Sequence, residues 1–261
     1  MEFTGGDVYQ KKFDPKLYLE YFHFGKGSVE DEFLEFNLKC FCKIFSSGLL
    51  KGGTLIDIGS GPTIYQLIPA CGTYENIIAT DYLDQNCQEI RKWLKKEPDA
   101  FDWSSVVQHV CQLEGNRETC AEKEAKLRRS IKQILRCDIH QRNPLAPVSL
   151  APVDCLLSTE CLESACNDQS SYESALKNLR SLLKVGGHFI LSGVLGCTFY
   201  RVGPHKFSSM TFTEEMLRAG LSAAGFAIVE FNVEPRVSNA NMEDCDFTGK
   251  YVIVARKDKE A

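Results

Sequence analysis

The chain has 261 residues, 44% of them hydrophobic and 25% charged, which suits one α/β domain with extra elements or two small domains. A formal net charge of −5 disfavours a nucleic-acid or anionic-membrane partner, because such partners select basic surfaces. The N-terminus lacks the apolar stretch of a signal peptide, and no apolar run is long enough to span a bilayer. We therefore expect a cytoplasmic protein with reduced cysteines, and the absence of CxxC spacing predicts no metal site.

The first half of the chain predicts helices followed by strands that alternate with helices. Residues 1–50 are aromatic-rich and helical, with one helix near 30–46. The elements expected after them are strands at 54–58 and 76–81, amphipathic helices at 84–96 and 121–135, and a third strand that ends near Asp138.

The second half continues the alternation and then changes. We expect strands at 153–159 and 188–192, a helix at 171–184 that Gly186-Gly187 ends, a helix at 213–224, and strands at 226–233 and 250–256. Alternating strands and helices indicate a doubly wound, mostly parallel sheet. No helix separates the last two strands, so they should pair antiparallel at an edge, joined by the long loop 234–249.

The strongest motif is LIDIGSGPTIY at 55–65, where a strand enters a glycine turn. Gly59 and Gly61 let a ligand approach the backbone, and Asp81 follows at the end of the next strand, where such folds place an acid for ribose hydroxyls. A dinucleotide motif needs a third glycine, but Ile64 stands there, and no basic residue follows the turn. An uncharged nucleoside with an amino-acid tail fits better; the alternative is a turn that is merely tight.

Longer stretches resemble the nicotinamide, indolethylamine and phenylethanolamine N-methyltransferase family, and most closely its first two members. They include IDIGSGPTIYQ from Ile56, TDYLDQN from Thr80, KWLKKEP from Lys92, FDW from Phe101 and LEGN from Leu113. The resemblance implies a class I S-adenosylmethionine-dependent methyltransferase fold: a Rossmann-like α/β fold whose seven-stranded, mostly parallel sheet has an antiparallel final strand. It also implies a monomer in which an N-terminal helical cap, residues 1–50, joins a methyltransferase domain, residues 51–261, in one structural unit.

The resemblance further implies which residues bind the cofactor, S-adenosyl-L-methionine. Asp81 would accept the ribose hydroxyls, Asp138 the adenine amino group, and Asn86 would lie near the methionyl end. A second family tyrosine in the cap is replaced by Phe22, so its hydroxyl contact is missing. The full implied set is Tyr18, Gly59, Ser60, Thr63, Tyr65, Asp81, Tyr82, Asn86, Asp138, Ile139 and Thr159.

The chemistry of the acceptor directs attention to two acids. A sulfonium methyl is already activated, so the enzyme must mainly position the acceptor nitrogen in line with it. A pyridine nitrogen needs no base, whereas an alkylammonium must first lose a proton to a group such as a carboxylate. Glu160 and Glu163 are the candidate catalytic residues, and the CLE sequence ending at Glu163 resembles the amine-binding acid of the phenylethanolamine enzyme. Alternatively, either acid is solvated at the start of a helix.

The rest of the acceptor site is expected in residues 191–203 and in the following FSS sequence. Its candidate substrate-binding residues are Glu163, Gly193, Cys197, Tyr200 and Ser209. Tyr200 could instead pack in the core, and Ser209 could be an ordinary loop hydroxyl. The nicotinamide enzyme has an aspartate where Gly193 stands, so we expect nicotinamide to be a poor acceptor.

The main prediction is thus methyl transfer from S-adenosylmethionine to the nitrogen of a small amine or N-heterocycle. A dinucleotide-dependent oxidoreductase is disfavoured by the incomplete glycine motif. Methylation of protein or nucleic acid is disfavoured by the acidic composition. A catalytically silent cofactor-binding protein and a methyltransferase of thioether acceptors remain alternatives.

Overall fold

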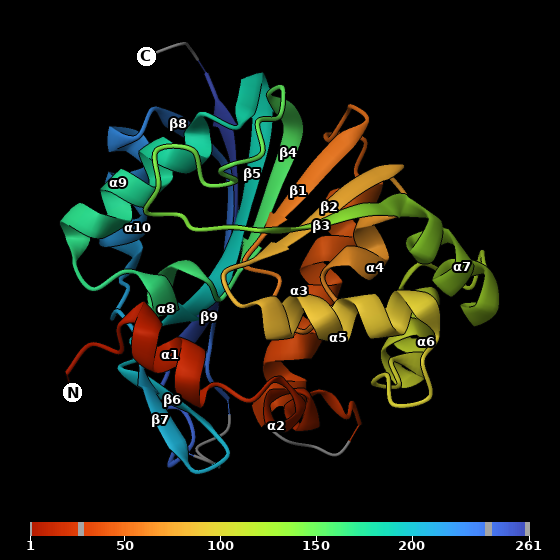
Figure 1. The fold of residues 1–261 in the computed structure, drawn as a ribbon. Helices are drawn as coiled ribbons and strands as arrows, with labels where there is room; N and C mark the ends of the chain where they lie inside the picture. Colours follow the sequence, from red (N-terminus) through yellow and green to blue (C-terminus); the bar gives the residue numbers. More distant parts are fainter. Residues whose placement is uncertain (1, 26–28, 238–241, 259–261) are drawn as a thin grey trace.

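The computed structural model describes residues 2–25, 29–237 and 242–258. At its centre is a seven-stranded sheet with the strand order β3-β2-β1-β4-β5-β9-β8 (Figure 1). The strands are β1 (Thr54–Ile58), β2 (Asn76–Asp81), β3 (Ile131–Arg136), β4 (Val153–Thr159), β5 (Leu183–Leu195), β8 (Phe226–Pro235) and β9 (Gly249–Lys257). All neighbours pair parallel except β9, which is antiparallel to both β5 and β8. The sheet confirms the predicted fold class, with its antiparallel final strand.

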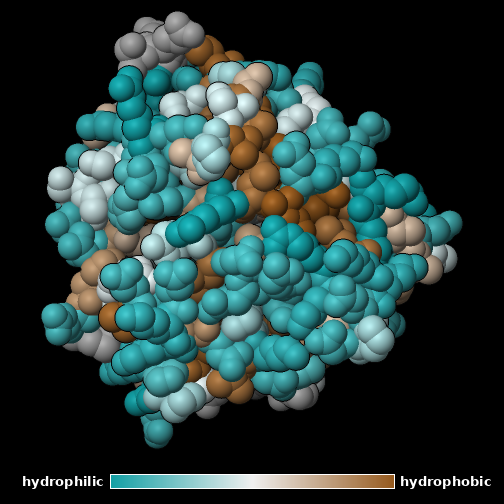
Figure 2. Space-filling model, viewed as in Figure 1, coloured by the Kyte–Doolittle hydropathy of each residue, from teal (hydrophilic) through white to brown (hydrophobic). Residues whose placement is uncertain are grey.

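Helices cover both faces of the sheet (Figure 1). One face carries α3 (Val29–Ser46), α4 (Leu67–Ala70), α5 (Asp84–Lys95), α6 (Ser104–Leu113) and α7 (Cys120–Ser130). The other face carries α9 (Gln169–Arg180) and α10 (Glu214–Ala223). Figure 2 shows that the outer surface in this view is mostly hydrophilic, with hydrophobic residues gathered in a band across it.

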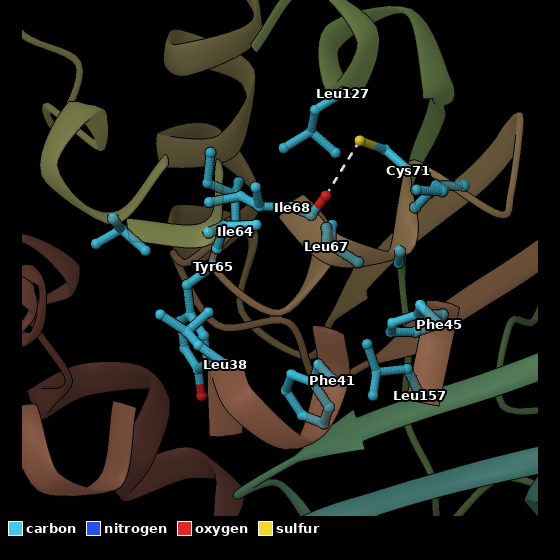
Figure 3. Close-up of a cluster of buried hydrophobic side chains, with 14 of the residues drawn as sticks. Leu38, Phe41, Phe45, Ile64, Tyr65, Leu67, Ile68, Cys71, Leu127 and Leu157 are labelled. Carbon is cyan, nitrogen blue, oxygen red and sulfur yellow. Dashed lines mark hydrogen bonds between the residues drawn. The ribbon is translucent and has the colours of Figure 1, made fainter. Parts of the chain in front are cut away.

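The core consists of two apolar layers, one on each side of the sheet. Successive residues of β1 alternate between them: Leu55 belongs to one cluster and Ile56 to the other, as side-chain alternation along a strand requires. In the first layer, Phe41 and Phe45 of α3 lie beside Leu157 of β4, and Leu38 lies beside Tyr65 (Figure 3). Helix α3 is therefore part of the main core, although it belongs to the N-terminal 50 residues.

The remaining elements gather at the carboxyl ends of the parallel strands. They are α1 (Gly6–Lys12), α2 (Pro15–Leu19), a 3-10 turn (Glu20–Phe22), α8 (Leu162–Ala165) and a hairpin of β6 (Phe199–Val202) and β7 (His205–Ser208). Thr4 and Ser208 fasten the N-terminal segment to the hairpin. The Thr4 N–H donates to the Ser208 hydroxyl at 2.7 Å, and the Ser208 N–H donates to the Thr4 hydroxyl at 2.9 Å.

Several predicted boundaries were wrong. The helix expected at 121–135 ends at Ser130, and residues 131–136 form β3 instead. This edge strand has an exposed, polar outer side, so its apolar residues mimic helical spacing. The pair Gly186-Gly187 does not end a helix: α9 stops at Arg180, and both glycines lie within β5.

The last two strands pair antiparallel as predicted, but β9 lies inside the sheet and only β8 forms its edge. The sequence prediction did not include the β6–β7 hairpin, α4 or α6, and it considered a helix start near α8 only as an alternative. Part of the predicted loop 234–249, residues 238–241, lies outside the described residues. Among the described residues, no helix has both the length and the apolar character required to cross a membrane.

Candidate active site

A cavity of about 390 Å³ lies at the carboxyl ends of β1, β2 and β4, beneath α1 and α2. Parallel sheets bind ligands at this edge, where the strand order reverses between β1 and β4. All but two of the predicted site residues line it: Tyr18, Gly59, Ser60, Thr63, Tyr65, Asp81, Tyr82, Asp138, Ile139, Thr159, Glu160, Glu163, Cys197, Tyr200 and Ser209. The two exceptions are Asn86 and Gly193.

The glycine turn after β1 has the close backbone approach that the motif predicted. Gly59 and Gly61 both adopt left-handed conformations, with φ of +69° and +61°. A Cβ atom on Gly59 would lie 2.3 Å from the Cys161 Sγ, so this position has no room for a side chain. The turn thereby keeps its backbone at the cavity wall.

Asp81 is held rigidly at the end of β2. Its Oδ1 accepts hydrogen bonds from the Leu83 N–H at 2.8 Å and the Asn86 Nδ2 at 3.0 Å, and its Oδ2 accepts one from the Gly61 N–H at 2.8 Å. Burial raises the pKa of Asp81, and the donated hydrogen bonds oppose that rise. Each carboxylate oxygen has two lone pairs, so Oδ2 can still accept from a ligand hydroxyl. Asn86 thus supports Asp81 from behind instead of lining the cavity.

Several packed aromatic side chains close the side of the cavity nearest the N-terminal helices. Phe22 stacks on Tyr65, with ring centroids 5.3 Å apart, and lies 5.2 Å from Tyr18. Its ring packs among other rings, a position that needs no hydroxyl group. Tyr200 likewise stacks on Phe207 of the hairpin at 5.4 Å while it lines the cavity. Tyr200 therefore combines the packing role and the wall role that the sequence left open.

Glu163 is a buried acid that lines the cavity beside β5, separated from Asp81 on β2 by β1 and β4 in the strand order. Its side chain is 2% exposed, which rules out the solvated alternative. Oε1 accepts a long hydrogen bond of 3.3 Å from the Val194 N–H, and Oε2 is without a hydrogen-bond partner among the described residues. Burial raises the pKa of Glu163 to about 7. This carboxyl group can therefore change its protonation near neutral pH.

Glu160 lies at the end of β4 in a different environment. It is half-buried and has a left-handed backbone, with φ of +53°, and its N–H donates to the Ser192 carbonyl at 2.9 Å. A non-glycine residue in this region is uncommon and often marks a functional site. The hydroxyl group of the preceding residue, Thr159 Oγ1, is buried and has no hydrogen-bond partner among the described residues.

Gly193 does not line the cavity, but it makes room for Glu163. A Cβ atom there would lie 2.2 Å from the Glu163 Oε1 and 2.9 Å from the Tyr251 hydroxyl oxygen. The Glu163 carboxylate occupies the space beside Gly193, so a hydrogen-bond acceptor is present there although Gly193 has no side chain. That nicotinamide is a poor acceptor stays a prediction, and the missing aspartate alone does not support it.

The sequence from residue 1 to 258 matches the NNMT/PNMT/TEMT family. The chain belongs to this family. Nicotinamide N-methyltransferase of Sus scrofa is 51% identical over 257 residues, 98% of this chain and 97% of the relative. The enzyme of that name from Homo sapiens is 49% identical over 98% of this chain and 97% of its own. Indolethylamine N-methyltransferase of Mus musculus is 45% identical over 99% of this chain and 98% of its own.

Solved structures share the fold of this chain at low sequence identity. One from Methanosarcina mazei has a TM-score of 0.56 at 17% identity, covering 83% of this chain and 98% of that chain. Magnesium protoporphyrin IX methyltransferase from Synechocystis PCC 6803, solved with the cofactor bound, has a TM-score of 0.57 at 11% identity, covering 96% and 94%. The predicted family, fold and enzyme class, with S-adenosylmethionine as methyl donor, are confirmed.

The structure also brings residues into the family site that the sequence prediction missed. Tyr9 and Phe13 of the N-terminal segment line the cavity and pack on Phe207. Behind the glycine turn, Gln66 Nε2 donates to Asp57 Oδ2 at 2.8 Å, and burial raises the pKa of Asp57 to about 7. An acid inside the otherwise apolar strand TLIDI was the signal for this pair, since buried acids need partners.

Proposed function

We propose that the chain transfers the methyl group of S-adenosylmethionine to the nitrogen of a small amine or N-heteroaromatic acceptor. The observation that carries the proposal is one cavity with two unlike ends. One end has the glycine turn and Asp81, and the other has the buried Glu163 with an unpartnered oxygen. The names of the relatives support the same acceptor classes: nicotinamide, indolethylamine and phenylethanolamine.

At the cofactor end, we propose that Asp81 accepts hydrogen bonds from the ribose hydroxyls, because its Oδ2 keeps a free lone pair beside the glycine turn at the cavity. Asn86 acts as a positioning residue through Asp81. Asp138 and Ile139 would contact the adenine. The remaining proposed contacts are Tyr18, Gly59, Ser60, Thr63, Tyr65, Tyr82 and Thr159. The bound cofactor supplies a methyl group on a sulfonium, which is already electrophilic.

At the acceptor end, we propose that Glu163 binds the acceptor's N–H groups and removes a proton from an alkylammonium. A pKa of about 7 suits a general base that works near neutral pH. The side chains of Glu160, Cys197, Tyr200 and Ser209 would form the surrounding wall. For a neutral pyridine nitrogen no proton must leave, and positioning alone would provide the rate enhancement.

The N-terminal helices would exclude water from this reaction. Thr4 and Ser208 exchange hydrogen bonds across the cavity edge, and Gln85 Nε2 donates to the Phe13 carbonyl at 2.8 Å. We propose that residues 1–50 form the cap of a methyltransferase domain of residues 51–261, with α1 and α2 over the cavity and α3 packed into the shared core, so that the two are one structural unit. A cytoplasmic, monomeric enzyme with a small-molecule substrate, without nucleic-acid or membrane partners, completes the proposal.

A methyl-transfer screen tests the proposal. Labelled S-adenosylmethionine is combined with pyridines, indolethylamines, phenylethanolamines, imidazoles and thioethers. We expect transfer to nitrogen acceptors, and for alkylamines kcat/KM should rise as the pH passes about 7, because Glu163 then becomes ionised. Cofactor binding without transfer to any acceptor would favour a catalytically silent cofactor-binding protein. Transfer to thioethers alone would favour a methyltransferase of thioether acceptors. Either result would reject the proposed function.

A further inference from the structure

Two cysteine thiols face each other at the acceptor end of the cavity. The Sγ atoms of Cys197 and Cys245 are 3.4 Å apart, and both residues line the cavity. Cys197 lies between β5 and β6 and is 1% exposed, whereas Cys245 lies in the segment 242–248 before β9 and is half-buried. Solvent therefore reaches the pair through Cys245.

The backbone around the pair holds the two segments together. Cys245 forms a β-bridge with Tyr200, and the Arg201 N–H donates to the Asp244 carbonyl at 2.8 Å. On the other side, the Thr198 N–H donates to Asp246 Oδ1 at 2.7 Å. These contacts bracket both cysteines, so their proximity is built into the fold and does not depend on two mobile side chains.

We propose that Cys197 and Cys245 are a redox-modification site that forms a reversible intramolecular disulfide. A disulfide has an S–S distance of about 2.05 Å, so the sulfur atoms must approach by only about 1.4 Å. The bond would tie the segment 242–248 to the turn between β5 and β6 and fix one wall of the acceptor end. It is expected to slow acceptor turnover, an effect that rests on the proposed function.

A small-molecule disulfide such as oxidised glutathione serves as the oxidant. The thiolate of Cys245, which solvent reaches, attacks one of its sulfur atoms, forms a mixed disulfide and releases one thiolate. Cys197 then loses its proton and attacks the Cys245 sulfur, which releases the second thiolate. Two protein thiols are oxidised by two electrons, one small disulfide is reduced to two thiols, and the two protons pass to the released thiolates. Contact with the Cys245 thiol and burial raise the pKa of Cys197, which slows this second attack.

The disulfide should act on one end of the cavity only. Asp81 and its donors belong to β2, α5 and the turn after β1, none of which carries either cysteine. The oxidised enzyme should therefore lose kcat/KM for the acceptor while its affinity for S-adenosylhomocysteine stays unchanged. A general effect of oxidation on folding would lower both quantities.

The test compares the full chain after incubation with oxidised or reduced glutathione. Tryptic peptides ending at Arg201 and at Lys250 are mapped without reduction, and kcat/KM and S-adenosylhomocysteine affinity are measured in parallel. We expect the two peptides to be linked, and a loss of kcat/KM that dithiothreitol reverses. Cys245→Ser should abolish both the link and the difference between oxidised and reduced enzyme. Cys40→Ser, at a partly exposed cysteine of α3, is the matched control and should behave as the wild type.

Three results would overturn the proposal: no linked peptides, a link without any change in kcat/KM, or a stable glutathione adduct on Cys245. If the reduced enzyme methylates none of the acceptors, the proposed function fails instead. The peptide map then still decides whether the disulfide forms, because it needs no activity.

Discussion

The two ends of the cavity each contain a buried carboxylate, but the protein treats them differently. Asp81 accepts three hydrogen bonds of 2.8–3.0 Å from the chain itself. Glu163 is buried to a similar degree, yet it accepts one bond of 3.3 Å, and its Oε2 has no partner among the described residues. Both groups are buried and line the same cavity, so the difference lies in the hydrogen bonds that the chain donates to each of them.

The comparison teaches where each end of the site obtains its binding energy. A carboxylate already fixed by its donors presents its remaining lone pairs in one orientation, as a cofactor of constant shape requires. A carboxylate without enough donors has an uncompensated cost of burial, which a ligand with N–H groups can relieve. We therefore interpret Asp81 as the preorganised end and Glu163 as the end whose hydrogen bonds the acceptor completes.

Removing the base at the acceptor end should lower activity the most. Glu163→Gln keeps the shape but removes the base, so kcat/KM for alkylamines should fall by about 10²- to 10⁴-fold, whereas neutral pyridines should lose much less. Steady-state kinetics on one acceptor of each class measure the difference. Equal losses for both classes would show that Glu163 is structural.

The stability of the same variant is its control. The pKa of Glu163 is raised from 4.5 to about 7 in the folded protein, so the folded state binds more protons than the unfolded state between these values. Its contribution to stability therefore falls as the pH rises from 4.5 to about 7 and stays low above that. Glu163→Gln should match the wild type at pH 4 and be more stable at pH 8, by up to about 3 kcal/mol. An inactive but more stable variant has not lost activity by unfolding.

Removing the acid at the cofactor end should have the second-largest effect, on cofactor affinity. Asp81→Ala would leave the ribose hydroxyls without a charged partner, at a cost of about 2–3 kcal/mol, or about 30- to 150-fold in affinity for S-adenosylhomocysteine. Asn86→Ala removes one of the three donors to Asp81 and should have a smaller effect in the same direction. Calorimetry on both variants decides this, and unchanged affinity in a folded Asp81→Ala protein would refute the assignment.

Displacing the Glu163 carboxylate should change activity the least. Gly193→Ala should displace the Glu163 carboxylate, since its Cβ would lie 2.2 Å from Oε1, and crowding of this kind costs about 1–3 kcal/mol. Alkylamine kcat/KM should fall with it. The paired variant Gly193→Asp with Glu163→Ala places a carboxylate on β5 instead of α8 and should regain activity relative to Glu163→Ala alone. No gain in the pair would mean that the place beside Gly193 is not where the acceptor binds.

Individual residues show how far the sequence predicted the site. The glycine turn and Asp81 were predicted from spacing alone, because a strand, a turn and the end of the next strand are local features that parallel pairing brings together. The role of Asn86 could not be predicted in this way. Its side chain points to Asp81, a contact that depends on how α5 is oriented against β2.

Gly193 shows more clearly what the sequence could not predict about the site. From the sequence, Gly193 was interpreted only as the loss of an aspartate. In the structure, its missing side chain leaves space that the Glu163 side chain of α8 fills. The paired sulfur atoms of Cys197 and Cys245, 48 residues apart, likewise have no spacing that predicts them.

The sequence by itself determined the alternating fold, the glycine turn and its acid, the family, and hence the cofactor. These depend on local periodicity and on contacts between neighbouring strands, which short stretches of residues specify. Packing of the whole chain was needed to show that Glu163 is buried with an unpartnered oxygen, that Asn86 donates to Asp81, and that β9 lies inside the sheet. These features depend on burial and on hydrogen bonds between distant segments, whose free energies arise only when the layers pack.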